Sequence, residues 1–162
     1  MGYWVRGVVC LVVVGMFNSF AAGAPVVRFD QALYEIVDGQ TFQVHVVLDA
    51  DDAMAGNQIL VNGLFSMAFR MTFDPSNASV SGSASVSLPA ALNDDGLGGP
   101  PFINVGSGFV EVRAALDPAE LQPYFGEGAG ASQKMRLATI TIQDLAPDDY
   151  TLGLEILKSI PT

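Results

Sequence analysis

Few side chains in this 162-residue sequence have the types and spacing that catalysis requires. His45 is the single histidine, and it alternates with apolar neighbours, with no nucleophile motif in the chain. We interpret it as a surface residue on the outer face of a sheet. The acidic pairs Asp51–Asp52, Asp94–Asp95 and Asp148–Asp149 are adjacent residues in loops, whereas acid–base catalysis needs carboxyl groups held in a fixed geometry. We therefore predict that the protein has no catalytic residues and is not an enzyme.

Metal and cofactor sites are equally poorly supported. Zinc is bound by clusters of cysteine and histidine, and this chain has one of each. Calcium takes six to eight oxygen ligands, and the spacing of Asp49, Asp51 and Asp52 is suggestive, but the EF-hand pattern is absent. We expect no cofactor and no metal ligands, with calcium in the acidic loops as the lesser alternative to ordinary solvation.

Charge excludes two classes of partner. The chain has 17 acidic and 7 basic residues, which gives a net charge of −10. Proteins that bind nucleic acid carry basic patches that neutralise phosphate, and proteins that adhere to anionic lipid carry basic clusters. We therefore expect neither a nucleic-acid partner nor a stable membrane insertion.

The first 24 residues predict a secretory signal peptide. Arg6 precedes an eleven-residue apolar run, Gly7–Phe17, and small residues follow it up to Ala24. The run is shorter than the ~20 residues of a membrane span. We expect cleavage after Ala21 or after Ala24, export of the protein, and a single domain over residues 25–162. Cys10 leaves with the leader, so the exported domain has no thiol.

The strongest structural pattern lies between Gly63 and Pro75. Large apolar residues alternate with small or polar ones over nine positions. Such a period of two sorts side chains onto the two faces of a strand, and it would scatter them around a helix. The expected inward residues are Phe65, Met67, Phe69, Met71 and Phe73, and the expected outward residues are Ser66, Ala68, Arg70 and Thr72. We predict a central strand in a protein of two packed sheets.

Further short apolar segments separated by turns complete an all-β pattern. In the segment Thr41–Asp49, the predicted inward residues are Phe42, Val44, Val46 and Leu48, and Val47 is among the outward ones. A helix of one or two turns is expected from Asp117. About nine strands at a spacing of roughly 8–12 residues are typical of a jelly-roll β-sandwich. The other predicted strands are Val26–Phe29 with Ala32–Val37, Gln58–Val61, Ser79–Leu88, Phe102–Val105, Phe109–Leu116, Met135–Ile142 and Tyr150–Leu157.

Three segments together resemble a cohesin domain, the secreted nine-stranded jelly-roll module that anchors dockerin-bearing proteins. They read VDGQTFQVHVVLD, GLFSMAFRMTFDPSNASV and MRLATITIQDLAPDDYTLGLEI, and the resemblance covers most of Val26–Ile156. It implies a non-catalytic module with a dockerin-like or cell-surface protein partner. A cohesin ends with one more strand, which pairs back near its N-terminal strand. Here that strand is missing, or the chain is a fragment, and we expect an unpaired sheet edge.

The resemblance also implies a binding face. A partner is expected to dock on the outer face that includes the central strand, where Ser66, Ala68, Arg70 and Thr72 point. Glu111 and Arg113 join them if the neighbouring strand has the same phase. Arg70 is the expected anchor, because its planar guanidinium is a fork of hydrogen-bond donors. The alternative is that these six residues are ordinary solvated positions.

A carbohydrate-binding module is the second functional interpretation. Flat polysaccharide is held by a row of exposed aromatic rings. The exported domain has no tryptophan, since Trp4 lies in the leader, and Tyr34, Tyr124 and Tyr150 are dispersed along the sequence. Most phenylalanines fall on inward positions. The composition thus disfavours an extracellular polysaccharide as the partner and leaves it as the alternative to a protein.

Overall fold

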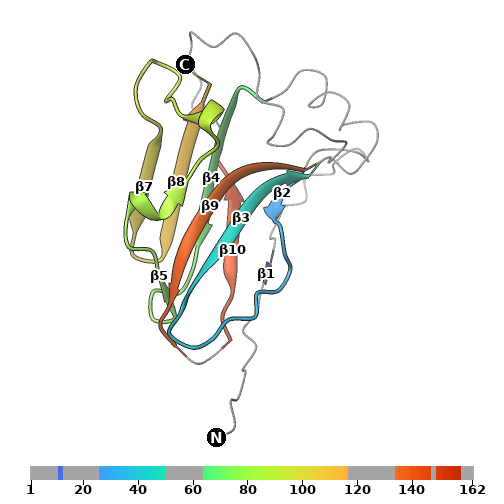
Figure 1. The fold of residues 1–162 in the computed structure, drawn as a ribbon, viewed down its shortest axis with the longest axis vertical. Helices are drawn as coiled ribbons and strands as arrows, with labels where there is room; N and C mark the ends of the chain where they lie inside the picture. Colours follow the sequence, from blue (N-terminus) through green and yellow to red (C-terminus); the bar gives the residue numbers. More distant parts are fainter. Residues whose placement is uncertain (1–10, 13–25, 50–63, 117–133, 147–148, 158–162) are drawn as a thin grey trace, which may run out of the picture.

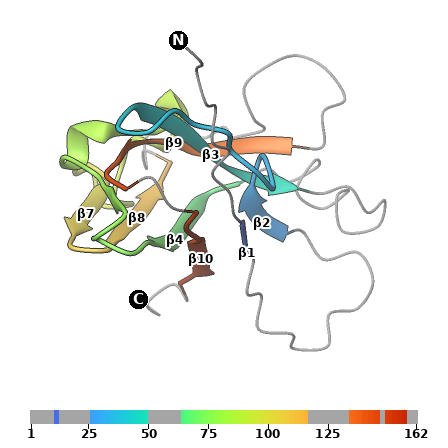
Figure 2. The same cartoon turned by 90° about the horizontal axis from the view of Figure 1, so that it is seen from below.

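The computed structural model describes residues 11–12, 26–49, 64–116, 134–146 and 149–157. Two β-sheets face each other across a hydrophobic core, and the described residues contain no α-helix (Figure 1). Viewed from below, β3 and β9 lie in one layer, and β4, β8 and β10 lie in the other (Figure 2). The prediction of an all-β jelly-roll sandwich is confirmed.

Sheet A has the strand order β1-β10-β4-β8-β7. Its central strand is β4 (Ser66–Thr72), which is antiparallel to β8 (Phe109–Ala115) on one side and to β10 (Leu152–Ile156) on the other. Beyond β8 lies β7 (Phe102–Gly106), and the short β1 (Leu11–Val12) pairs in parallel with β10. The stretch with the strongest alternation is therefore the centre of a sheet, as predicted.

Sheet B has the strand order β2-β3-β9-β5, and β6 also pairs with β9. Its longest pairing joins β3 (Thr41–Asp49) to β9 (Lys134–Asp144), from Thr41 opposite Gln143 to Asp49 opposite Lys134. The remaining strands are β2 (Val26–Phe29), β5 (Ala78–Ser79) and β6 (Val86–Ser87).

The core consists of the inward side chains of both sheets. Phe69 and Met71 of β4 are fully buried, and Phe73 follows them in the same phase. Each such side chain contributes roughly 1.5–3 kcal/mol of transfer free energy when it leaves water. The largest fully buried apolar side chains are Phe29, Val44, Val46, Phe69, Met71, Leu92, Val110, Val112, Leu137, Ile140 and Ile142.

Two predicted orientations are wrong. Phe65 is 57% exposed, because it precedes β4 at the end of the sandwich, where the alternation runs past the edge of the core. Val47 was expected to face outward and is buried. The β3–β9 register shifts between Val46 and Val47, after which Val47 lies between Arg28 of β2 and Arg136 of β9. A β-bulge of this kind breaks the strict alternation of faces.

Two predicted strands also differ from the structure. The segment Ala32–Val37 forms no strand. The expected edge strand over Ser79–Leu88 is divided into β5, a 3-10 turn η1 (Ser83–Ser85) and β6, with Gly82 at a φ of 146° between the two pairings. A second 3-10 turn, η2, spans Ala90–Leu92. The predicted strand Gln58–Val61 and the helical turn after Asp117 lie outside the described residues.

A buried carboxylate ties the turn before β3 to the end of β9. Gly39, with a φ of 73°, donates its N–H to Asp144 Oδ2 over 2.9 Å, and the N–H of Asp144 donates to the carbonyl of Gln40 over 3.0 Å. Asp144 is fully buried, and Tyr150 lies close to it. Burial, together with the charge of Asp144, raises the pKa of the Tyr150 hydroxyl. These contacts fix the relative position of the two longest strands of sheet B.

Phe69→Ala should lower the free energy of unfolding by about 3–5 kcal/mol, because it opens a cavity at the centre of the core. Phe65→Ala is the matched control, since it removes the same atoms from the same strand phase at an exposed position. Urea titration of both variants measures the difference. Equal midpoints for the two variants would contradict the inward orientation of Phe69.

Candidate partner-binding face

The outer face of sheet A brings together all six residues that the sequence singled out. In the β4–β8 register, Ala68 lies opposite Arg113 and Arg70 lies opposite Glu111. Glu111 and Arg113 therefore point to the same face as Ala68 and Arg70, as predicted. Ser66 and Thr72 occupy the two ends of β4 and are exposed. Because the inward residues of both strands are held by the core, these outward positions cannot rotate away from the face.

Neighbouring strands add residues to this face. Cross-strand pairing arranges them in rows that run across sheet A, from β10 through β4 and β8 to β7. The sequence alone did not reveal the members from β7 and β10, because their place depends on strand order. The rows are Gly153, Thr72, Phe109 and Gly106; then Glu155, Arg70, Glu111 and Asn104; then Ala68, Arg113 and Phe102.

Glu111 lies between two arginines at the centre of the face. Its Oε2 accepts a hydrogen bond from Arg70 Nη2 over 2.6 Å, and its Oε1 accepts one from Arg113 Nε over 2.9 Å. The carboxylate side chain is only 8% exposed, whereas the side chains of Arg70 and Arg113 are 40% and 35% exposed. A partner approaching this face therefore meets the guanidinium groups and has little access to the carboxylate between them.

Aromatic packing holds the Arg70 side chain in place. The guanidinium carbon lies 5.5 Å from the centre of the Phe109 ring, within the range of a cation–π contact. The Phe109 ring in turn lies over Gly106, where an added Cβ would come within 2.3 Å of the ring. Glycine is thus required at that position for the ring to lie across the sheet. Arg70 Nε is buried and has no hydrogen-bond partner among the described residues.

The protonation states follow from this arrangement. The hydrogen bond from Arg70 lowers the pKa of the Glu111 carboxyl, and Arg113 adds to the effect, although burial acts in the opposite direction. The hydrogen bond to Glu111 raises the pKa of Arg70 in spite of partial desolvation, and the charge of Glu155 contributes. These shifts favour the ionised form of Glu111 and the protonated form of Arg70.

The residues considered for catalysis and metal binding are dispersed. His45 lies on β3, and its Nδ1 is 2.9 Å from Thr139 Oγ1. Asp94 and Asp95 bind amide groups of their own loop. Among the residues that the structure describes, no three His, Cys, Asp or Glu side chains are grouped as metal ligands. Asp51, Asp52 and Asp148 lie outside the described residues. The calcium site that was considered at Asp51 and Asp52 therefore also lies outside them.

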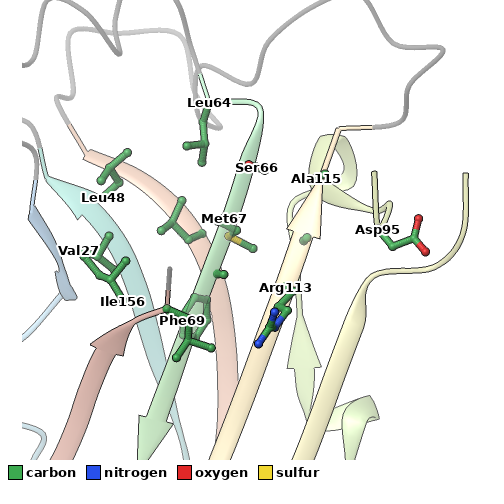
Figure 3. Close-up of a pocket in the computed structure, with 14 residues that line it drawn as sticks. Val27, Leu48, Leu64, Ser66, Met67, Phe69, Asp95, Arg113, Ala115 and Ile156 are labelled. Atoms are coloured by element: carbon green, nitrogen blue, oxygen red, sulfur yellow. The ribbon is translucent and has the colours of Figure 1, made fainter. Parts of the chain in front are cut away.

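An open cavity of about 540 Å³ lies at the end of the sandwich where β4 begins (Figure 3). Its lining is mainly apolar and includes Val27, Leu48 and Ile156, with Met67 and Phe69 at the border of the core. The charged residues along it are Asp95 and Arg113, on the side of β8. The cavity thus adjoins the outer face of sheet A at its Arg113 end.

No described helix is long and apolar enough to cross a membrane. Comparison by sequence found no matching family profile and no matching curated protein.

Comparison of structures found cohesin modules at low identity. A type II cohesin–X–dockerin complex from Acetivibrio cellulolyticus matches with 13% identity and a TM-score of 0.46, covering 85% of this chain and 79% of the other. The second type II cohesin module of the ScaA scaffoldin from that organism matches with 13% identity and a TM-score of 0.47, covering 86% and 73%. A chain of the CaDoc0917–CaCohA2 complex matches with 14% identity and a TM-score of 0.48, covering 73% of both chains.

Glu111→Gln should lower the free energy of unfolding at pH 7 by about 1–3 kcal/mol, because a charged acceptor of two hydrogen bonds is lost. The pKa of Glu111 is depressed in the folded protein, so its contribution is complete above the ordinary glutamate pKa of about 4.3 and is lost as the pH falls through the folded value. Urea titrations at pH 7 and pH 3 measure this effect. The difference in the free energy of unfolding between wild type and variant should be smaller at pH 3 than at pH 7.

Glu155→Gln is the control for this pH dependence, because Glu155 lies in the same row and is exposed. We expect it to change stability little at either pH. If Glu111→Gln lowers the free energy of unfolding by the same amount at pH 7 and at pH 3, the ionised carboxylate is not what stabilises the face.

Proposed function

We propose that this protein is a secreted, non-catalytic interaction module that resembles a cohesin and binds a dockerin-like or cell-surface protein partner. The partner docks on the outer face of sheet A, over β4 and β8. The sequence resemblance to cohesins suggests the class of partner, and the arrangement of charged residues on this face supports the place where it docks.

The observation that carries the proposal is the buried carboxylate of Glu111 beneath two solvent-facing guanidinium groups. Holding an arginine in one rotamer before binding reduces the entropy lost when a partner docks. A planar guanidinium then offers paired donors to a carboxylate, and arginine is enriched among the residues that dominate binding energy. The protein is strongly acidic overall, and this face holds two of its seven basic residues on either side of one largely covered carboxylate, which favours the approach of an acidic group of a partner.

The same face is a poor platform for sugar rings. Phe109 is covered by the guanidinium of Arg70, and Phe102, at the edge of the face, is about half exposed. Stacking on polysaccharide needs several uncovered rings in a row, and the described residues of this face supply one such ring. The charge arrangement favours a protein over a polysaccharide.

Export is part of the proposal and predicts the N-terminus of the mature protein. The leader over residues 1–24 contains β1, so its removal takes away the strand that pairs with Leu152 and Gly153 of β10. Mass spectrometry of the extracellular protein should find Ala22 or Pro25 as the first residue. An extracellular or membrane-bound product that retains the whole leader would contradict cleavage.

Arg70→Ala and Arg113→Ala should each weaken the partner by about fivefold or more, which corresponds to at least about 1 kcal/mol. Arg136→Ala is the matched control, because it removes the same side chain from β9 of the opposite sheet. Wild type and variants, immobilised without the leader, are exposed to the extracellular proteins of the source. Captured proteins are identified by mass spectrometry, and their affinities are then measured in solution.

Binding that is equal for all three variants would place the interface elsewhere. A parallel incubation with insoluble polysaccharide tests the alternative function. Retention on polysaccharide without any captured protein would overturn the proposal in favour of a carbohydrate-binding module.

A further inference from the structure

A short loop projects from the edge of sheet A beside Arg113. It comprises residues 95–101, and we call it the Leu97 loop. Just before it, Asp94 pairs with Ala115 of β8 through two backbone hydrogen bonds. Just after it, Phe102 of β7 pairs with Arg113. Both ends of the loop are therefore fixed at neighbouring outward positions of β8, and the loop lies at the border of the partner-binding face.

Two carboxylates hold the backbone of this loop in one conformation. Asp94 Oδ1 accepts hydrogen bonds from the N–H groups of Gly96 and Gly98, over 2.5 and 3.2 Å. Asp95 Oδ1 accepts them from Leu97 and Gly99, over 2.7 and 3.1 Å. Four consecutive amides are thus bound by two side chains.

Glycine is required at two of these positions. Gly96 and Gly98 both have a φ of 89°, a left-handed conformation that other residues adopt at a cost. Gly96 also packs against the surface of β8, because an added Cβ would lie 3.5 Å from the Cβ of Ala115. The alternation of glycine with other residues and the two aspartates specify the loop together.

The side chain presented by this well-defined backbone is Leu97, which is 88% exposed. It is the most exposed of the large apolar residues that the structure describes. Phe102, where the loop returns to the sheet, is 48% exposed. Exposed apolar surface on a preorganised loop favours binding, since little further ordering is needed when the side chain enters a partner.

We propose that Leu97 is an anchor that inserts into an apolar pocket of the same protein partner, and that a carboxylate beside this pocket binds Arg113. The inference rests on the proposed function and adds what the partner must offer, namely a folded surface with an apolar socket next to an acidic side chain. Charge complementarity selects this occupant, because Arg113, which pairs with Phe102 where the loop returns to the sheet, is partly exposed, whereas the Asp95 carboxylate already accepts two amides of the loop.

The test uses Leu97→Ser and Leu97→Met in the chain without its leader, with the protein captured by the wild type as the probe. Leu97→Ser should weaken binding by about tenfold, because it removes the group that fills the socket, while Leu97→Met should stay within about threefold of wild type. The thermal midpoints of both variants should equal that of the wild type, since Leu97 takes no part in the core. Leu145→Ser is the control, because Leu145 is also exposed and follows β9 of the opposite sheet.

Asp95→Ala tests whether the hydrogen bonds that order the loop contribute to binding through Leu97. This variant keeps Leu97 but frees the amides of Leu97 and Gly99, and it should weaken binding by a smaller factor than Leu97→Ser. Asp95→Asn retains an acceptor oxygen and should restore most of the affinity. If Asp95→Ala and Leu97→Ser lower the affinity equally, the result still supports a preorganised anchor. If neither variant lowers the affinity, the anchor is wrong.

The outcomes separate this inference from the function on which it rests. If Arg70→Ala and Arg113→Ala weaken binding and Leu97→Ser does not, the anchor is wrong and the face is retained. If none of these variants changes the affinity, both are wrong. A wild-type protein that captures no protein also overturns both.

Discussion

Burial of one face of the long strands is the constraint on which the rest of this structure depends. Phe69 and Met71 of β4 are enclosed together with Val44 and Ile140 of the opposite sheet. A side chain on a strand has two directions available, so fixing these residues inward fixes their neighbours outward. The register of the strands follows, because a slip of one residue would place Arg70 in the core and Phe69 in water.

The charged network on the outer face is a consequence of that register. Glu111 reaches both arginines because Arg70 lies directly opposite it and Arg113 lies two residues along its own strand. The contact with Arg113 lies within β8, whereas the contact with Arg70 is not specified by the local sequence of β4 or β8 alone. The core selects the pairing, and the pairing then brings opposite charges together. Ion pairs on exposed sheets are commonly weak, but here the carboxylate is covered and each oxygen has a partner.

The sequence was informative where structure depends on near neighbours. Alternation placed Phe69, Met71 and Phe73 in the core and Arg70 outside it, and the phase required for Glu111 and Arg113 is the one observed. These assignments need a period of two and no knowledge of which strands are adjacent. The central position of β4 was indicated by the size of its alternating apolar side chains, which need a large opposing surface.

The predictions that failed depend on features that a period of two does not encode. The bulge that buries Val47 is a local irregularity, and the exposure of Phe65 reflects where the opposite sheet ends. The contribution of Glu155 to the face depends on β10 being the neighbour of β4. The Leu97 loop did carry a signal in Asp-Asp-Gly-Leu-Gly-Gly, because aspartate side chains often bind amides two residues ahead and glycine accepts a positive φ. On sequence grounds Asp94 and Asp95 stand out only as an adjacent carboxylate pair in a loop, and no pattern draws attention to Leu97 between the glycines.

The strand order of sheet A also sets the order in which the molecule can be assembled. A chain that folds from its N-terminus can pair β4 with β8 as soon as Ala115 is available, but the other neighbour of β4 is β10, which comes much later in the sequence. Until Leu152–Ile156 arrive, the strand at the centre of the finished sheet has an open edge and an incompletely covered apolar face. Open edges of this kind are where nascent chains associate with one another. During that interval the edge of β4 is where association between chains is expected, whatever the stability of the finished sandwich.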